Sequence, residues 1–188
     1  MTNWMRSSKD FKERRIAVSV KGITDTTQYL TFKLSDEVFA LDISKVREVL
    51  DFITVTKVPK IPEFMRGVIN LRGSVVPVVD LRLKFGMTKT EKTVNACIII
   101  TEVEIDGEKI VIGALADSVQ EVMDLEPDQI EPAPKIGTSM NTDFIKGMGK
   151  RNEQFIMILD IDRVFSEAEL VAVGEASEGM PHELEKAA

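Results

Sequence analysis

The sequence predicts a mainly β protein in which two small β-barrels pack on each other. The prediction rests on three observations: short segments of alternating apolar and polar residues, turn residues between these segments, and an internal repeat. Alternation with a period of two indicates strands with one buried face. Short strands at regular spacing favour barrels over an open sheet, because closure removes exposed strand edges.

Residues 26–86 are predicted to form the first barrel. Leu30, Phe32 and Leu34 alternate with polar residues, which is typical of a half-buried strand. Pro77 has no backbone N–H, so its strand is expected at an edge or a bulge. The expected strands of this barrel are 29–34, 38–41, 46–50, 55–58, 68–71 and 75–79.

Residues 93–166 are predicted to form the second barrel on the same plan. The pair Asp106-Gly107 is a strong hairpin signal between two apolar segments. The expected strands are 93–103, 110–115, 119–125 and 155–159.

The two ends of the chain are predicted to differ from the barrels. Residues 1–25 lack strand periodicity and carry six basic and three acidic side chains, so we expect either a short helix or a flexible arm. Residues 160–176 are expected to form a closing helix with one apolar face. Residues 167–188 then contain the end of this helix and a polar tail.

The two halves of the chain share a repeat. Residues 64–85 align with 144–165 at an offset of 80, and 46–49 align with 119–122 at an offset of 73. The repeat implies two barrels of similar structure with a groove between them as the natural binding surface. The identical pairs in the longer block are Phe64/Phe144, Gly67/Gly147, Asp80/Asp160 and Phe85/Phe165.

Composition argues against several classes of function. The net charge is −7 and the pI about 4.9, whereas proteins that bind nucleic acids normally present a basic face to the phosphates. The single histidine, His182, lies in the polar tail, and the single cysteine, Cys97, lies in an apolar run. These residues form neither a Cys/His metal site nor a Ser-His-Asp site. We therefore predict no catalytic residues, metal or cofactor, and a protein that is not an enzyme.

The sequence also bears on location. No apolar run approaches the ~20 residues needed to span a bilayer, and the basic residues near the N-terminus are not followed by the apolar segment of a secretory signal. We expect a cytoplasmic protein.

One segment resembles the signature of a known family. Residues 67–82 read G-V-I-N-L-R-G-S-V-V-P-V-V-D-L-R. This stretch is similar to the CheW family pattern G-V-x-N-L-R-G-x-x-x-P-V-x-D-L-R, and every specified position is filled. The resemblance extends from about Tyr29 to Phe165. It implies a single CheW-like domain at about 26–170, composed of two SH3-like, five-stranded barrels with short helical turns and a C-terminal helix.

The resemblance also implies a function. CheW-like proteins are non-catalytic adaptors that bind the cytoplasmic tip of a chemoreceptor, a methyl-accepting chemotaxis protein, and the regulatory domain of the CheA histidine kinase. Such a protein would be recruited to receptor arrays at the membrane without inserting into it. The alternative interpretation is a β-barrel module that binds a small ligand or nucleic acid, because such barrels host those functions too.

Two charged residues are candidates for partner binding. Arg72 lies in the turn of the signature, where nothing in the backbone requires an arginine. Its guanidinium either docks a carboxylate of a partner or forms an internal ion pair with Glu48. By resemblance, both Arg72 and Glu48 contribute to coupling.

Three valines are further candidates, because they lie on the repeated strand. Val46, Val49 and Val122 either line a groove for the receptor tip or belong to the barrel core.

Four residues are predicted to have structural roles. Asn70 is expected to hold the turn by hydrogen bonds, and Gly73 to supply its backbone freedom. Asp80 and Asp160, at equivalent positions of the repeat, are each expected to cap a helical turn.

Overall fold

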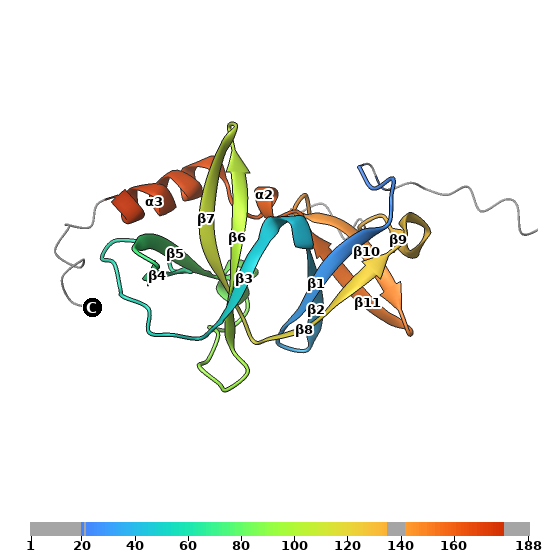
Figure 1. Ribbon diagram of the computed structural model, residues 1–188, viewed down its shortest axis with the longest axis horizontal. Coiled ribbons are helices and arrows are strands. Elements are labelled where there is room, and N and C mark those ends of the chain that lie inside the picture. Colours follow the sequence, from blue (N-terminus) through green and yellow to red (C-terminus); the bar gives the residue numbers. More distant parts are fainter. Residues whose placement is uncertain (1–19, 21, 135–141, 179–188) are drawn as a thin grey trace, which may run out of the picture.

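The protein consists of two β-sheets that lie side by side along its longest axis, as the computed structural model in Figure 1 shows. Residues 20, 22–134 and 142–178 are described. The prediction of a mainly β fold with two packed units is confirmed.

Each sheet has its own strand order. The five-stranded sheet has the order β3-β6-β7-β5-β4, and the six-stranded sheet has the order β8-β1-β2-β11-β10-β9. The strands of the five-stranded sheet are β3 (Val46–Asp51), β4 (Met65–Leu71), β5 (Ser74–Asp80), β6 (Cys97–Ile105) and β7 (Glu108–Ala116). The strands of the six-stranded sheet are β1 (Thr27–Leu34), β2 (Glu37–Asp42), β8 (Ser118–Leu125), β9 (Ile130–Glu131), β10 (Ile145–Arg151) and β11 (Gln154–Leu159).

The two halves of the chain exchange strands. β1 and β2 join the six-stranded sheet with strands of the second half, whereas β6 and β7 join the five-stranded sheet with strands of the first half. The predicted division into barrels at 26–86 and 93–166 is therefore wrong. The physical reason is the length of the links: the short 3-10 helix η1 (Ile43–Lys45) and the single residue Asp117 carry the chain from one sheet directly to the other.

The strand exchange follows the internal repeat. β5 pairs in parallel with β7 at Val78 and Gly113, and β11 pairs in parallel with β2 at Ile158 and Ala40. Val78 and Ile158 are equivalent at the offset of 80, and Ala40 and Gly113 at the offset of 73. The two sheets are thus built from equivalent strands, which supports an internal duplication.

A shared hydrophobic core joins the two sheets. It contains buried residues from both sheets and an array of phenylalanine rings. The ring centroids of Phe85 and Phe144 are 5.0 Å apart, those of Phe39 and Phe85 5.7 Å, and those of Phe64 and Phe165 5.9 Å. Phe85–Phe144 and Phe64–Phe165 are equivalent contacts in the repeat, so each half contributes one ring to each pair.

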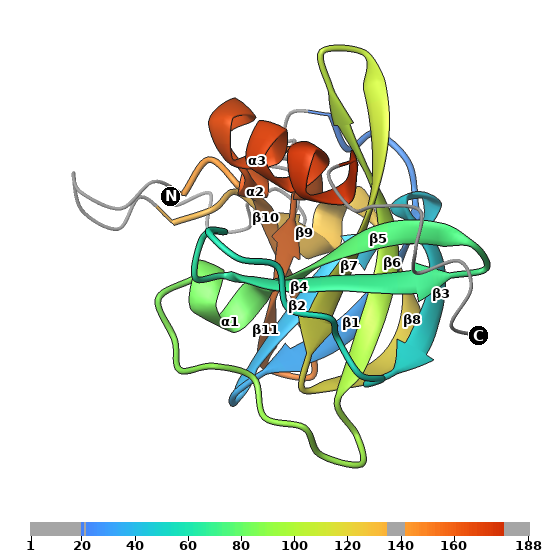
Figure 2. The same cartoon turned by 90° about the vertical axis from the view of Figure 1, so that its left-hand side faces the viewer.

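Three short α-helices complete the fold of the described residues. They are α1 (Leu81–Lys84), α2 (Ile161–Val164) and α3 (Glu167–Glu178), and Figures 1 and 2 place α3 beside the five-stranded sheet. The single helix predicted over 160–176 is interrupted at Phe165 and Ser166. Ser166 and Glu169 explain the interruption, because their side chains bond each other's backbone N–H and so start a new helix.

Two strand predictions are corrected. Residues 55–58 do not form a strand, and only Thr56 makes an isolated bridge, to Val68. Pro77 does not mark an edge, because β5 lies between β7 and β4. It is tolerated there because the pairing with β7 begins one residue later, at Val78.

The ends of the chain are described only in part. Of the arm predicted over 1–25, Val20 and Ile23 are buried against the six-stranded sheet, and residues 1–19 and 21 lie outside the described residues. The polar tail was predicted within 167–188, and its residues 179–188 also lie outside the described residues.

Candidate functional site: a groove beside the Arg72 turn

The turn between β4 and β5 holds Arg72 in an uncommon backbone conformation. Arg72 has a φ of 51° and Gly73 a φ of 88°, the combination required by the two-residue hairpin turns that match strand twist. The side-chain oxygen of Asn70 accepts a hydrogen bond from the N–H of Gly73 at 2.9 Å. Asn70 and Gly73 thus form the turn that presents Arg72.

Arg72 forms a two-pronged ion pair with Glu48 on β3. Two guanidinium nitrogens of Arg72 donate to the two carboxylate oxygens of Glu48 at 2.7 and 2.9 Å. The Arg72 side chain nevertheless remains 76% exposed, against 25% for Glu48. The internal ion pair is therefore present, and the guanidinium is still accessible to a partner.

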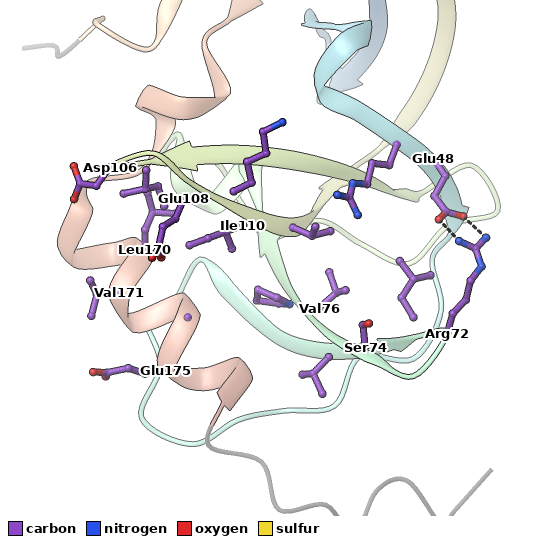
Figure 3. Close-up of a pocket in the computed structure, with 18 residues that line it drawn as sticks. Glu48, Arg72, Ser74, Val76, Asp106, Glu108, Ile110, Leu170, Val171 and Glu175 are labelled. Atoms are coloured by element: carbon purple, nitrogen blue, oxygen red, sulfur yellow. Dashed lines mark hydrogen bonds and ion pairs between the residues drawn. The ribbon is translucent and has the colours of Figure 1, made fainter.

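The pair lies at one end of a groove of about 1130 Å³ on the five-stranded sheet. Figure 3 shows Arg72 and Glu48 at this end, Asp106 and Glu108 at the opposite end, and α3 as a wall. The apolar lining comes from β4, β5, β6, β7 and α3, and includes Leu71, Val76, Ile105, Ile110, Leu170 and Val171. An apolar floor flanked by charged residues of both signs suits an amphipathic segment of a partner.

Two further basic residues line the groove from β3 and from the start of β7. Arg47 and Lys109 both pair with Glu102 on β6, at 2.8 and 3.6 Å. The hydrogen bond from Arg47 holds the pKa of the Glu102 carboxyl below its ordinary value. The Glu102 carboxylate thus pairs with two cationic groups that belong to the lining of the groove.

The three predicted valines do not line this groove. Val46 is half-buried and packs against the shared core, whereas Val49 is 41% and Val122 48% exposed. Val49 and Val122 lie on β3 and β8, which are the outer strands of the two sheets. The groove also lies on one sheet and not between the two, so the binding surface expected between the two barrels stays a prediction.

Asp80 and Asp160 occupy equivalent positions but differ in contacts. The Asp80 carboxylate is fully buried and accepts hydrogen bonds from the N–H groups of Arg82 and Leu83, which makes it the predicted cap. It also accepts bonds from Arg66 at 2.8 Å and from the N–H and hydroxyl of Thr90 at 2.9 and 2.8 Å.

The capping prediction for Asp160 is wrong. Its side chain makes no capping hydrogen bond and instead pairs with Arg163 at 3.4 Å. The carboxylate is drawn to a charged neighbour one turn along the chain, so the equivalence of the two aspartates does not extend to their hydrogen bonds.

Sequence reasoning missed two parts of the site. α3 was expected to be a closing helix, not a wall of the groove, and nothing in its sequence indicates that position. Val75, which lines the groove and is 38% exposed, was also not singled out. Here the repeat contained the signal, because the residue equivalent to Val75 at the offset of 80 is Phe155, which is 54% exposed at the same place on the six-stranded sheet.

Two further properties concern the described part of the chain. Its helices are all too short or too polar to cross a lipid bilayer. Within the same residues, His, Cys, Asp and Glu side chains do not gather in threes around a position suited to a metal ion.

Comparisons with known proteins agree with this architecture. A family model described as a CheW-like domain matches residues 28–169. The chain is 34% identical to the chemotaxis protein CheW of Klebsiella aerogenes over 81% of its own length and 89% of the relative's. It is 32% identical to that of Rhizobium meliloti over 76% of its length and 89% of the relative's.

A solved structure is similar as well. The crystal structure of the scaffolding protein TtCheW from Thermoanaerobacter tengcongensis has a TM-score of 0.67 and 36% sequence identity, covering 77% of this chain and 95% of that one. The residues that match the family model include both sheets and the strands that line the groove, whereas most of α3 lies beyond them. The chain described here belongs to the CheW-like family.

Proposed function

We propose that this protein is a non-catalytic chemotaxis adaptor that couples the cytoplasmic tip of a chemoreceptor to the regulatory domain of the CheA histidine kinase, in the cytoplasm at receptor arrays. Membership of the CheW-like family supports the adaptor role and favours it over a ligand- or nucleic-acid-binding module. The single observation that carries the proposal is the groove with the exposed Arg72 guanidinium at its end.

The groove fits one apolar face of a partner helix. Its apolar floor would contact residues one helical turn apart, as in other helix-in-groove complexes. Arg72 uses two of its five N–H donors on Glu48, so the remaining donors can bond a carboxylate of the partner. Asp106 and Glu108 at the other end favour a basic residue there, which would fix the direction of the helix.

A second contact surface is needed for coupling, and the outer strands β3 and β8 supply a candidate. Val49 and Val122 expose apolar side chains there. Two separate surfaces allow both partners to bind at once, each through a modest interface. Repetition of such contacts in an array raises avidity without new chemistry, and contacts that differ between two states of the array would transmit the signal.

Calorimetric titration tests the proposal. The purified full chain is titrated with a receptor-tip fragment and, separately, with the kinase regulatory domain. Arg72→Ala is expected to weaken binding of at least one partner by about tenfold, equivalent to one lost charge-assisted contact. The control is Arg151→Ala, which removes the arginine that pairs with Glu121 on the other sheet and should leave that affinity unchanged.

Two results would contradict the proposal. The first is a well-folded wild-type protein that binds neither partner. The second is an Arg72→Ala variant with unchanged affinity for both partners. That result would mean that neither partner binds at the Arg72 end of the groove.

A further inference from the structure

Two long connections lie against each other on the five-stranded half of the molecule. They are residues 52–64, between β3 and β4, and residues 85–96, between α1 and β6. The ring of Phe52 joins them: its centroid lies 5.7 Å from the Arg66 guanidinium carbon and 5.8 Å from the Lys92 ammonium nitrogen. The side chains of both connections therefore form one surface.

This surface contains a pocket of about 300 Å³ that is separate from the groove. Lys57 and Lys89, one from each connection, line it together with Arg66 and the single acid of the lining, Glu63. The rest of the lining is apolar, namely Val58, Ile61, Pro62, Met65 and Leu83. The pocket thus combines space for an apolar side chain with cations that can pair with acidic groups.

The lysines around the pocket are available to a partner. Lys57, Lys60, Lys89 and Lys92 are exposed, and among residues 20, 22–134 and 142–178 no carboxylate pairs with any of the four. The two connections carry these four lysines and two acids, Glu63 and Glu91, so their net charge is +2 in a chain of net charge −7. Arg66, by contrast, is already bonded to the buried Asp80.

We propose that this face, the basic pocket, binds an acidic protein segment that inserts one large apolar side chain between Lys57 and Lys89. The lysines would pair with carboxylates on either side of that residue. A long polyanion such as RNA fits less well, because the net charge of −7 repels it beyond the patch. The exposed Val94 and Ile53, at 96% and 41%, extend the apolar contact on the same two connections.

The acidic residues 124–131 of a second copy of this chain do not meet these requirements. Residues 124–131 carry four acids, but their large apolar side chains, Leu125 and Ile130, are buried at 1% and 3% exposure. They have no apolar side chain to insert. Residues 183–185 read Glu-Leu-Glu but are followed directly by Lys186, a cation that would face the lysines. The proposed partner is a different protein that exposes an apolar residue within an acidic segment, and dimerisation of the chain is the competing outcome that the test below detects.

An NMR titration of the isotope-labelled full chain tests the proposal. The probe is the blocked pentapeptide Asp-Glu-Leu-Glu-Asp, and the matched peptide carries Ser in place of Leu. The Leu peptide should shift amide signals in both connections. Lys57→Glu and Lys89→Glu should each weaken its binding by about fivefold, the loss expected for one charge contact.

The control variants separate this surface from others. Lys150→Glu makes the same charge change at an exposed residue of β10. It should alter the affinity for the peptide less than twofold, because only long-range electrostatic interaction connects Lys150 with the pocket. Arg72→Ala should also leave peptide binding unchanged. The proposal for the basic pocket and the proposed function of the groove can therefore be contradicted independently of each other.

Four outcomes would overturn the proposal. They are amide shifts confined to other parts of the chain, equal binding of the Leu and Ser peptides, equal weakening by Lys150→Glu, and tighter pocket binding of a short RNA or of phosphatidylglycerol vesicles than of the peptide. A dimerisation of the chain that Lys57→Glu abolishes would likewise assign the surface to a second copy.

Discussion

Arg72 and Glu48 tie together the two ends of the five-stranded sheet. Glu48 lies on β3, the first strand in the sheet order, and Arg72 follows β4, the last. The six-stranded sheet contains a similar pair, in which Arg151 at the end of β10 lies 3.4 Å from Glu121 on the outer strand β8. Glu121 is the repeat equivalent of Glu48, whereas Arg151 directly precedes Asn152, the equivalent of Arg72. Each sheet thus has an ion pair that joins an outer strand to a hairpin turn.

Exposure of these pairs limits what they contribute to stability. Arg72→Ala and Glu48→Ala should each lower the free energy of unfolding by about 1 kcal/mol or less. A double-mutant cycle should give a coupling of about 0.5–1 kcal/mol that falls in high salt. Chemical denaturation of the four proteins measures it. A coupling that high salt leaves unchanged would mean that the pair acts as a buried one.

The Arg151–Glu121 pair supplies the comparison. It has one contact of 3.4 Å and side chains that are 46% and 59% exposed, so its coupling should be smaller than that of Arg72 and Glu48. A larger coupling would contradict the geometric argument for both pairs.

Asp80 should matter far more for stability than Asp160. Asp80→Ala leaves the Arg66 guanidinium without its carboxylate and removes both bonds to Thr90, and should cost about 3 kcal/mol. Asp160→Ala breaks only a partly exposed pair with Arg163 and should cost less than about 1 kcal/mol. Thermal unfolding of both variants checks the difference, and equal losses would contradict it.

Thr90 provides a milder test of the same hydrogen bonds. Thr90→Val keeps the shape and the backbone N–H but removes the hydroxyl donor, and should cost about 1 kcal/mol. Hydrogen exchange should quicken mainly in residues 85–96, because Thr90 anchors this connection to Asp80.

Among the glycines of the repeat, Gly67 is the position at which an added side chain would disturb the structure most. Its φ is 134°, and an added Cβ would lie only 2.0 Å from the carbonyl oxygen of Thr56. Gly67→Ala should therefore cost about 3 kcal/mol or more, since both the backbone and the Thr56–Val68 bridge must shift. Gly73→Ala meets open space and carries only the strain of a positive φ, about 1 kcal/mol. Denaturation midpoints that rank the two variants in the opposite order would refute this reasoning.

The sequence alone was sufficient for most of the strands, although not for β9 and β10, and for part of the site. Alternation located β1, and the signature located the turn that carries Arg72, because both signals depend on neighbours in the chain. The ion pair with Glu48 was one of two interpretations, and only the sheet order decides that it forms. Local pattern and turn chemistry therefore predicted the elements and their candidate residues.

The exchange of strands could not be read from the sequence. Both β2 and β7 can pair with β5 or β11 by pattern, since the repeat makes the two partners similar. The choice depends on links as short as Asp117 between β7 and β8, and on phenylalanine contacts such as Phe85–Phe144 between the halves. The groove wall formed by α3 depends on the same tertiary contacts, so no local signal predicted it.

Glu169 should make the attachment of α3 dependent on pH. Partial burial raises the pKa of its carboxyl, but Lys84 and the bonds from Ser166 outweigh burial and hold the pKa below its ordinary value of 4.5. The unfolded chain then binds the proton more readily than the folded one. The contribution is present in full above 4.5 and is lost as the pH falls through the lowered folded value. The difference in unfolding free energy between wild type and Glu169→Gln should shrink with acidification, and a difference that grows would reverse the sign of the shift.

Cys97 should be unreactive in the folded protein. Burial raises the pKa of its thiol from 9.0 to about 11, and the side chain is 6% exposed. At pH 8 the thiolate fraction should thus be about 100-fold lower than in the unfolded chain. Alkylation by iodoacetamide, followed by mass spectrometry, should be slow in buffer and fast in denaturant. Because β6 pairs with both β3 and β7, rapid alkylation in buffer would mean that the middle of the five-stranded sheet opens readily, contrary to its burial.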